Sequence, residues 1–193
     1  MGPKHLGADT DPRTHRLRRM LAAVALAAVC APALAAPAGH AHEHGAVKLD
    51  IAIEAGKVSL QLETPLDSLI GFERAPRTDA ERQRVAAMVA RLRAADTLFT
   101  FDPAAGCTLA GVELVSAPLK LGKAEPPAAG DEHADLDGDF AFDCKDSSKL
   151  SFIDVGLFKA FAGMQRITVQ VAMPKGQLKR TLTRPASRIG LAR

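Results

Sequence analysis

Alternating apolar and polar residues mark two parts of the chain as β-hairpins. In residues 47–54 an apolar side chain occupies every second position, and residues 58–62 repeat this alternation after a short Ala-Gly turn. Residues 167–173 and 178–183 show the same pattern on either side of a Pro-Lys-Gly turn. A period of two is typical of a strand with one buried face, so each pair predicts a hairpin packed on a core.

An amphipathic helix is predicted directly after Thr78. Thr78 and Glu81 have the spacing of a capping box, in which each satisfies a backbone amide of the other. Apolar residues then recur at intervals of three and four, and these are Val85, Met88, Val89 and Leu92. This spacing gives the helix one apolar face, and we interpret the arginines between them as a solvated face.

Shorter strands are predicted in the rest of the chain. They cover residues 98–101, residues 107–114 with Gly111 as a bulge, and residues 139–144. Residues 150–161 are apolar and fit either a strand or a short helix. Strands joined by short turns, with one clear helix, predict an α+β domain on an antiparallel sheet built from hairpins.

The first 35 residues are expected to be a cleaved export signal. A basic stretch at residues 16–19 precedes an apolar run at residues 20–29, and Ala33 and Ala35 supply a cleavage site. The run is too short and too rich in alanine to cross a bilayer core of ~30 Å. We therefore expect a periplasmic protein without a membrane span after cleavage.

Removing this segment changes the charge of the chain. The full sequence has 25 basic and 22 acidic residues and a net charge of +3, and the first 35 residues hold five of the basic and two of the acidic ones. The remaining part, about 158 residues, is close to neutral and long enough for one domain. Neither its charge nor its lack of tryptophan and tyrosine supports nucleic-acid binding. We expect a histidine-rich segment at residues 36–45 and one α+β domain at residues 46–193.

Two cysteines remain beyond the signal, Cys107 and Cys144. An isolated pair in an oxidising compartment most simply forms one disulfide. A thiolate metal site is the poorer alternative, because the two residues are far apart and form no C-x-x-C motif.

Four histidines also remain, and three of them alternate. His40, His42 and His44 would present three imidazoles on one side of an extended chain. Imidazole is a good ligand for zinc, copper and nickel, and much of it is neutral near pH 7. His133 stands among carboxylates that include Asp135, and zinc commonly takes four such nitrogen and oxygen ligands. The pattern predicts a metal site from these five residues, and the alternative is an exposed tract without a defined site.

An ordered set of motifs resembles the ZrgA-like proteins, periplasmic proteins linked to zinc uptake. The motifs are His42-Glu43-His44-Gly45, Pro65 with Gly71-Phe72-Glu73-Arg74-Ala75-Pro76, Ala104-Ala105-Gly106-Cys107, His133-Ala134-Asp135, Phe142-Asp143-Cys144 and Val155-Gly156-Leu157-Phe158. Together they extend over essentially the whole chain after the signal. The resemblance implies zinc binding through His42, His44 and His133, and support for a zinc importer or its binding protein.

The chain departs from the pattern of that family at two places. Histidine is common in the family where Arg74 stands, and a guanidinium stays protonated and does not bind zinc. Residues 120–130 also contain no histidine, where relatives usually carry a histidine-rich loop. We therefore expect a smaller or weaker site, completed by Glu43, Glu132 or Asp135.

The function predicted from the sequence is that of a periplasmic zinc-binding protein that supports zinc uptake or buffering for an envelope importer. Copper or nickel could replace zinc, because the residue types do not select among them. The alternative function is a non-enzymatic interaction module of the envelope with no physiological metal. An enzyme is not predicted, because the sequence contains neither a G-x-S-x-G nor an H-E-x-x-H motif.

Overall fold

The computed structural model describes Gly2, residues 44–123 and residues 134–191. The chain separates into two units, Met1–His40 and Ala41–Arg193, and the fold belongs to the second. The predicted signal peptide, most of the histidine-rich segment and the loop before Ala134 lie outside the described residues.

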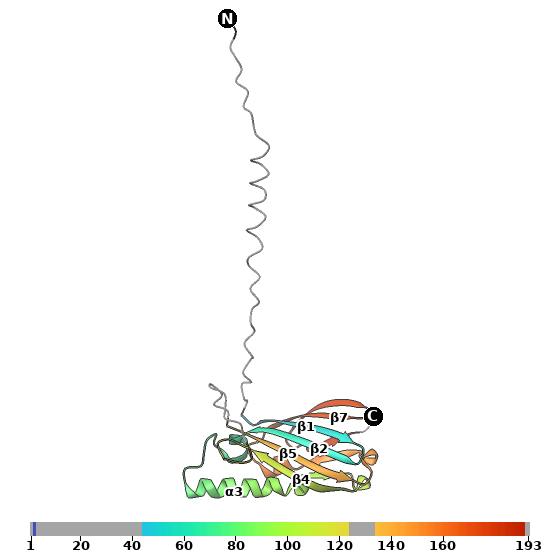
Figure 1. Ribbon diagram of the computed structural model, residues 1–193, viewed down its shortest axis with the longest axis horizontal. Coiled ribbons are helices and arrows are strands. Elements are labelled where there is room, and N and C mark those ends of the chain that lie inside the picture. The colour runs from blue at the N-terminus through green and yellow to red at the C-terminus, as the bar shows by residue number, and fades with distance from the viewer. Residues whose placement is uncertain (1, 3–43, 124–133, 192–193) are drawn as a thin grey trace. The chain divides into compact units, whose positions relative to one another are not determined.

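Six strands form the main sheet in the order β4-β5-β2-β1-β7-β8 (Figure 1). Their bounds are β1 Ala46–Glu54, β2 Lys57–Pro65, β4 Cys107–Val115, β5 Asp135–Cys144, β7 Arg166–Met173 and β8 Gly176–Thr183. Both hairpins predicted from the alternation are confirmed, since β1 pairs with β2 and β7 with β8 in antiparallel register. Apolar alternation therefore identified the strands and their buried faces correctly.

The two hairpins join through a parallel contact between β1 and β7. The sheet is thus mainly antiparallel but not entirely so, which the sequence pattern did not predict. Alternation shows which side of a strand is buried, but it carries no information on which strand lies next to it. β5 also begins at Asp135, four residues before the predicted start, because Leu136 continues the buried side of the strand between outward-facing aspartates.

A second sheet of three short strands, in the order β3-β6-β9, completes the fold. It consists of β3 Phe99–Phe101, β6 Phe152–Val155 and β9 Arg188–Gly190. The apolar stretch at residues 150–161, which fitted a strand or a helix, divides into β6 and the helix α4, Leu157–Ala160. This division buries Ile153, Val155 and Leu157 in the core.

Aromatic side chains link the two sheets. The ring centroids of Phe99 and Phe140 lie 5.2 Å apart, and those of Phe101 and Phe142 lie 4.6 Å apart, in tilted or edge-on contacts. Such geometry is favourable for aromatic pairs and adds to the burial of their surface. The core therefore lies between the inner face of the six-stranded sheet and the elements that cover it.

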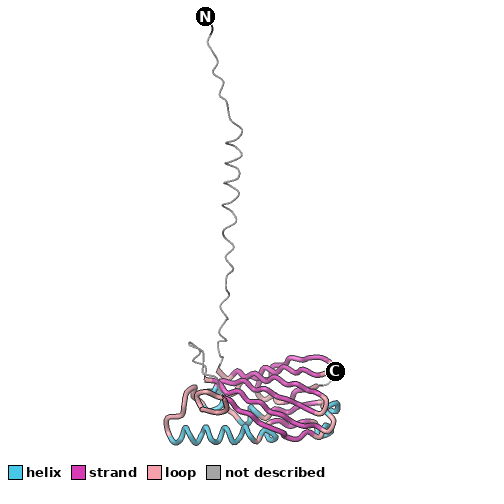
Figure 2. The backbone as a smooth tube through the Cα atoms, viewed as in Figure 1, coloured by secondary structure: helices cyan, strands magenta, loops and turns pink. Residues whose placement is uncertain are grey.

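Helix α3, Asp79–Arg93, lies along the strands (Figures 1 and 2) and buries Met88 and Leu92. Its predicted capping box is confirmed, because the Thr78 side chain accepts from the Glu81 amide while Glu81 accepts from the Thr78 amide. The α+β class is confirmed as well. None of the helices in the described residues is long and apolar enough to cross a membrane.

The predicted disulfide between Cys107 and Cys144 is present. It joins directly opposed residues of β4 and β5. The bulge predicted at Gly111 appears as a register shift between Leu109 and Gly111 in the same strand pair, with Ala110 as the extra residue. The Cys144 amide donates to the carbonyl of Gly56 in the turn between β1 and β2. The disulfide therefore closes the end of the sheet at which β1 finishes.

Candidate metal centre

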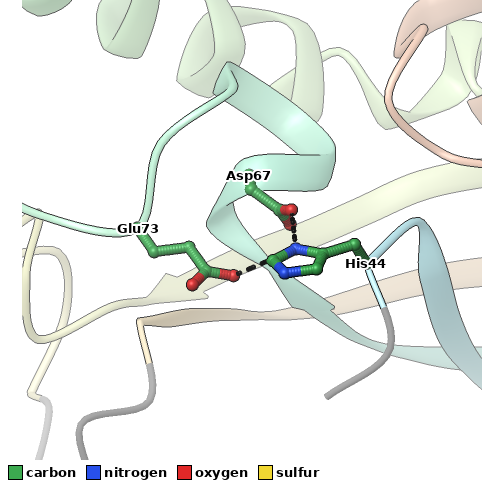
Figure 3. A group of neighbouring side chains, drawn as sticks. All are labelled: His44, Asp67 and Glu73. Carbon is green, nitrogen blue, oxygen red and sulfur yellow. Dashed lines mark hydrogen bonds and ion pairs between the residues drawn. The ribbon is translucent and has the colours of Figure 1, made fainter.

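A cluster of one imidazole and two carboxylates lies at the opposite end of the sheet, where β1 begins. His44, Asp67 and Glu73 each offer a ligand atom, and these atoms all lie within 4.8 Å of one another (Figure 3). His44 Nδ1 is hydrogen-bonded to Asp67 Oδ2 and lies 3.9 Å from Glu73 Oε1. In the described part of the chain, no other group of three or more such side chains meets this spacing.

The backbone of Gly45 holds His44 in place. The Gly45 amide donates to the hydroxyl of the buried Ser68 at 3.1 Å, and its carbonyl accepts from the amides of Gln165 and Arg166. Gly45 has a φ of +76°, and a Cβ atom there would lie 2.9 Å from Gln165 Cγ. Glycine is therefore needed at this position, and it fixes where the chain carrying His44 enters the first strand.

Asp67 comes from the first turn of α2, Leu66–Ile70, which directly follows β2. The Ser68 hydroxyl donates to Asp67 Oδ1 at 3.2 Å, so its second oxygen remains directed at His44. The Leu66 amide donates to the carbonyl of Ala134, which ties this helix to the start of β5. Asp67 thus sits on backbone that is anchored from two sides.

Glu73 lies in the loop between α2 and α3, and its neighbour Arg74 fixes that loop. Arg74 forms two hydrogen bonds with the Glu81 carboxylate, at 2.7 and 3.0 Å, and its guanidinium lies 5.0 Å from the centroid of the Phe72 ring. The Glu81 carboxylate also accepts from the amide of Arg77 at 2.6 Å. Arg74 therefore points to the start of α3, while Glu73 points to His44.

Two neighbouring carboxylates favour the protonated form of His44. The pKa of His44 is raised above its ordinary value, first by the hydrogen bond to Asp67 and then by the charges of Asp67 and Glu73, against a small opposing effect of desolvation. The side chain is 77 % exposed, compared with 22 % for Asp67 and 41 % for Glu73. A cation arriving from solvent can therefore reach the imidazole and replace its proton.

The arrangement offers one nitrogen and two oxygen ligands to a divalent cation. Zinc binds His nitrogen and Asp or Glu oxygen at ~2.0–2.2 Å, commonly with four ligands. These three side chains can converge on one ion with small rotations, because their ligand atoms already lie within 4.8 Å of one another and His44 and Glu73 are exposed. A hydrogen bond to Ser68 would orient Asp67 as a ligand, which is how outer residues commonly support metal sites.

Of the five residues predicted as ligands, His44 belongs to this cluster. Asp135 begins β5 beside Pro65, where its carbonyl accepts from Ser116, and it does not belong to the cluster. The other three predicted ligands lie outside the described residues, and they are His40, His42 and His133.

Sequence reasoning did not select Asp67 or Glu73 as ligands. Glu73 stands in one of the motifs that carried the family resemblance, so a signal for it existed. Asp67 stands two positions after Pro65 in a short segment without periodicity. Only the fold brings it next to His44, 23 residues away.

The fold and the site together define an α+β protein with an exposed histidine beside two carboxylates, residue types that can ligate a divalent metal ion. A family model of ZrgA family zinc uptake proteins matches residues 41–191, and the chain belongs to this family. A comparison with curated proteins finds no match.

Proposed function

We propose that this protein is a periplasmic zinc-binding protein that supports zinc uptake, by buffering zinc or delivering it to an importer in the envelope. The observation that carries the proposal is the contact of His44 with Asp67 and Glu73 at an anchored end of the sheet. Membership of the zinc uptake family supports zinc rather than copper or nickel, because the ligand types alone do not select among these metals.

The remaining ligands are proposed from the chain on either side of the cluster. His42 precedes His44 by two residues, so an extended backbone would direct both imidazoles the same way. His133 directly precedes Ala134, whose carbonyl accepts from the Leu66 amide next to Asp67. His42 or His133, with His40 as a further donor, would complete four-coordination around zinc.

An exposed site suits a protein that must release its metal. Most of the His44 side chain is open to solvent, so another protein can approach the ion without unfolding the sheet. We propose that the importer or its binding protein is this recipient, and that the export signal in residues 1–35 brings the chain to the compartment where they meet.

Calorimetry with zinc on the purified protein tests the proposal. We expect saturable binding at micromolar zinc and a loss of affinity of at least about tenfold in H44A, D67N and E73Q, since even residues that only support metal ligands commonly contribute 10–100-fold. Glu63→Gln is the matched control, because Glu63 is an exposed carboxylate paired with Lys48 on the same sheet.

Two outcomes would contradict the proposed function. The first is the absence of heat at micromolar zinc in the unaltered protein. The second is an equal effect of E63Q and H44A, which would indicate diffuse attraction to acidic groups. Parallel titrations of H42A and H133A decide which of them supplies the fourth ligand.

A further inference from the structure

A cavity lies at the end of the sheet where β1 finishes, far from His44. It has a volume of about 680 Å³ and is bordered by the β1–β2 turn, the β7–β8 turn, the connection from β5 to β6 and the residue after β9. The cavity and the His44 cluster lie at opposite ends of the nine-residue strand β1. At ~3.3 Å per residue, the length of this strand is close to 30 Å. Its volume falls within the range of small-molecule sites, about 300–1,000 Å³.

The floor of this cavity is apolar. Ile53 and Leu191 are buried there, while Leu150, Met173 and Leu178 pack against the core but keep part of their surface exposed. These partly exposed apolar side chains come from separate elements and together form an apolar surface on which a flexible hydrocarbon chain can pack. Methionine adds to this, because its unbranched side chain adapts to ligands of different shape.

Three cations that have no acidic partner among the described residues surround the opening. Lys145, Lys175 and Arg180 line the cavity, and none of them forms an ion pair with a carboxylate of the described residues. The lining contains two acidic residues, Glu54 and Asp146. Asp146 is already paired with Lys149 at 3.3 Å, so of these two only Glu54 has a charge that can offset the three cations. The opening therefore carries an excess of positive charge.

Arg180 is directed to the inner side of the sheet. It lies opposite Val169, which is fully buried, and it alternates with Leu178 and Leu182 on the core-facing side of β8. Among the described residues, its guanidinium donates a hydrogen bond to the carbonyl of the neighbouring Lys179. The Arg180 side chain is nevertheless exposed, because β8 is at the edge of the sheet, so its charge stays solvated and can be reached by an anion from solvent.

We propose that this cavity binds a single-chain amphiphile with an acidic head group. The hydrocarbon chain would cover the five apolar residues of the floor, and the head group, a carboxylate or a phosphate, would lie between Lys175 and Arg180. Pairing of an anion with Arg is stronger than a neutral hydrogen bond, so the head group would contribute to affinity as well as to orientation.

Calorimetry with dodecanoate below its critical micelle concentration tests this proposal. We expect saturable binding with one ligand per chain, and a loss of about tenfold or more in K175E/R180E, consistent with the removal of charge-assisted contacts. Lys179→Glu is the matched control, because Lys179 lies opposite Gln170 on the outer face of the same strand and should keep its affinity within about twofold. Dodecyl phosphate identifies the preferred head group, and dodecyl maltoside supplies the same chain without a charge.

Three results would overturn the proposal. They are the absence of saturable binding up to the solubility limit, equal binding of dodecyl maltoside and dodecanoate, and an equal loss of affinity in K179E and K175E/R180E. The charge of Arg180 would then serve only to keep an edge strand from pairing with another sheet. Melting curves show that each variant is folded, and K175Q/R180Q replaces the reversal variant if it is not. The result does not depend on zinc, since the two sites are separate.

Discussion

At the scale of single residues, the contact between His44 and Asp67 affects both the pKa of the imidazole and its ability to bind a metal ion. The carboxylates that would bind a cation together with the imidazole also stabilise its protonated form. Proton and metal therefore compete for His44. Metal affinity should rise as the pH increases through the raised pKa of this residue, because the ligand must be neutral.

We predict that NMR titration of the metal-free protein gives a pKa for His44 above 6.5. Asp67→Asn should move it back towards 6.5, because the principal hydrogen-bonding anion is lost while Glu73 remains at 3.9 Å. Glu73→Gln should have the smaller effect. An unchanged titration in D67N would show that the contact is absent in solution.

Glu81 provides a second test at this scale, at acid pH. Hydrogen bonds from Arg74 and from the Arg77 amide lower the pKa of Glu81 to about 2, from an ordinary value of 4.5. A carboxyl whose pKa is lowered by folding stabilises the native state above its unfolded pKa, and this contribution is lost as the pH falls towards the folded value.

In R74A we therefore expect the loss of stability to be greatest above about pH 5 and to shrink as the pH falls towards 2. Urea denaturation of the unaltered and variant proteins at several pH values measures this difference. A difference that stays constant over the whole range would show that Arg74 does not act through the Glu81 charge.

At the scale of elements, the loop between α2 and α3 is fixed by the same acid that caps α3. The Glu81 carboxylate accepts from Arg74, from the Arg77 amide and from the Thr78 amide, while Thr78 completes the capping box. The family resemblance presented Arg74 as the loss of a ligand. Its contacts show that it holds the loop in which the neighbouring Glu73 approaches His44.

Two variants distinguish an effect of Arg74 on the loop that carries Glu73 from an effect on the stability of the whole fold. Arg74→Ala should weaken zinc binding several-fold, because the loop carrying Glu73 loses its anchor. Thr78→Ala should lower the free energy of unfolding by about 1 kcal/mol, as the loss of a helix cap typically does, but leave zinc affinity unchanged. Calorimetry and thermal melting on both variants measure this. Equal zinc affinities in R74A and T78A would contradict the role given to Arg74.

At the scale of the whole molecule, the sheet separates two ends with different chemistry. The start of β1 meets α2 at the His44 cluster, whereas its end meets the disulfide and the apolar cavity. The disulfide joins cysteines 37 positions apart, and in the chain-entropy model a loop of this size contributes about 4 kcal/mol by restricting the unfolded chain.

We predict that C107S/C144S lowers the free energy of unfolding by up to about 4 kcal/mol, measured by urea denaturation. Zinc affinity of the folded variant should remain as in the unaltered protein, because the disulfide lies at the far end of β1. A parallel loss of zinc affinity in fully folded protein would show that the two ends are coupled.

The sequence by itself determined the parts of this protein that depend on neighbouring residues. Period-two alternation identified the four strands of the hairpins, and the spacing of Thr78 and Glu81 identified the start of α3. The cysteine pair was predicted because two cysteines left in a chain that is expected to be exported most simply form one disulfide. An ordered set of motifs indicated the family, and a family model matches residues 41–191.

Only the tertiary structure decided which strands are neighbours and which carboxylates meet His44. The parallel pairing of β1 with β7 joins segments about 120 residues apart, and no local pattern specifies such a contact. Asp67 reaches His44 because the short helix α2 directly follows β2 and because the Gly45 amide donates a hydrogen bond to the Ser68 hydroxyl in that helix. Periodicity reports burial along one element, whereas a metal site depends on where separate elements meet.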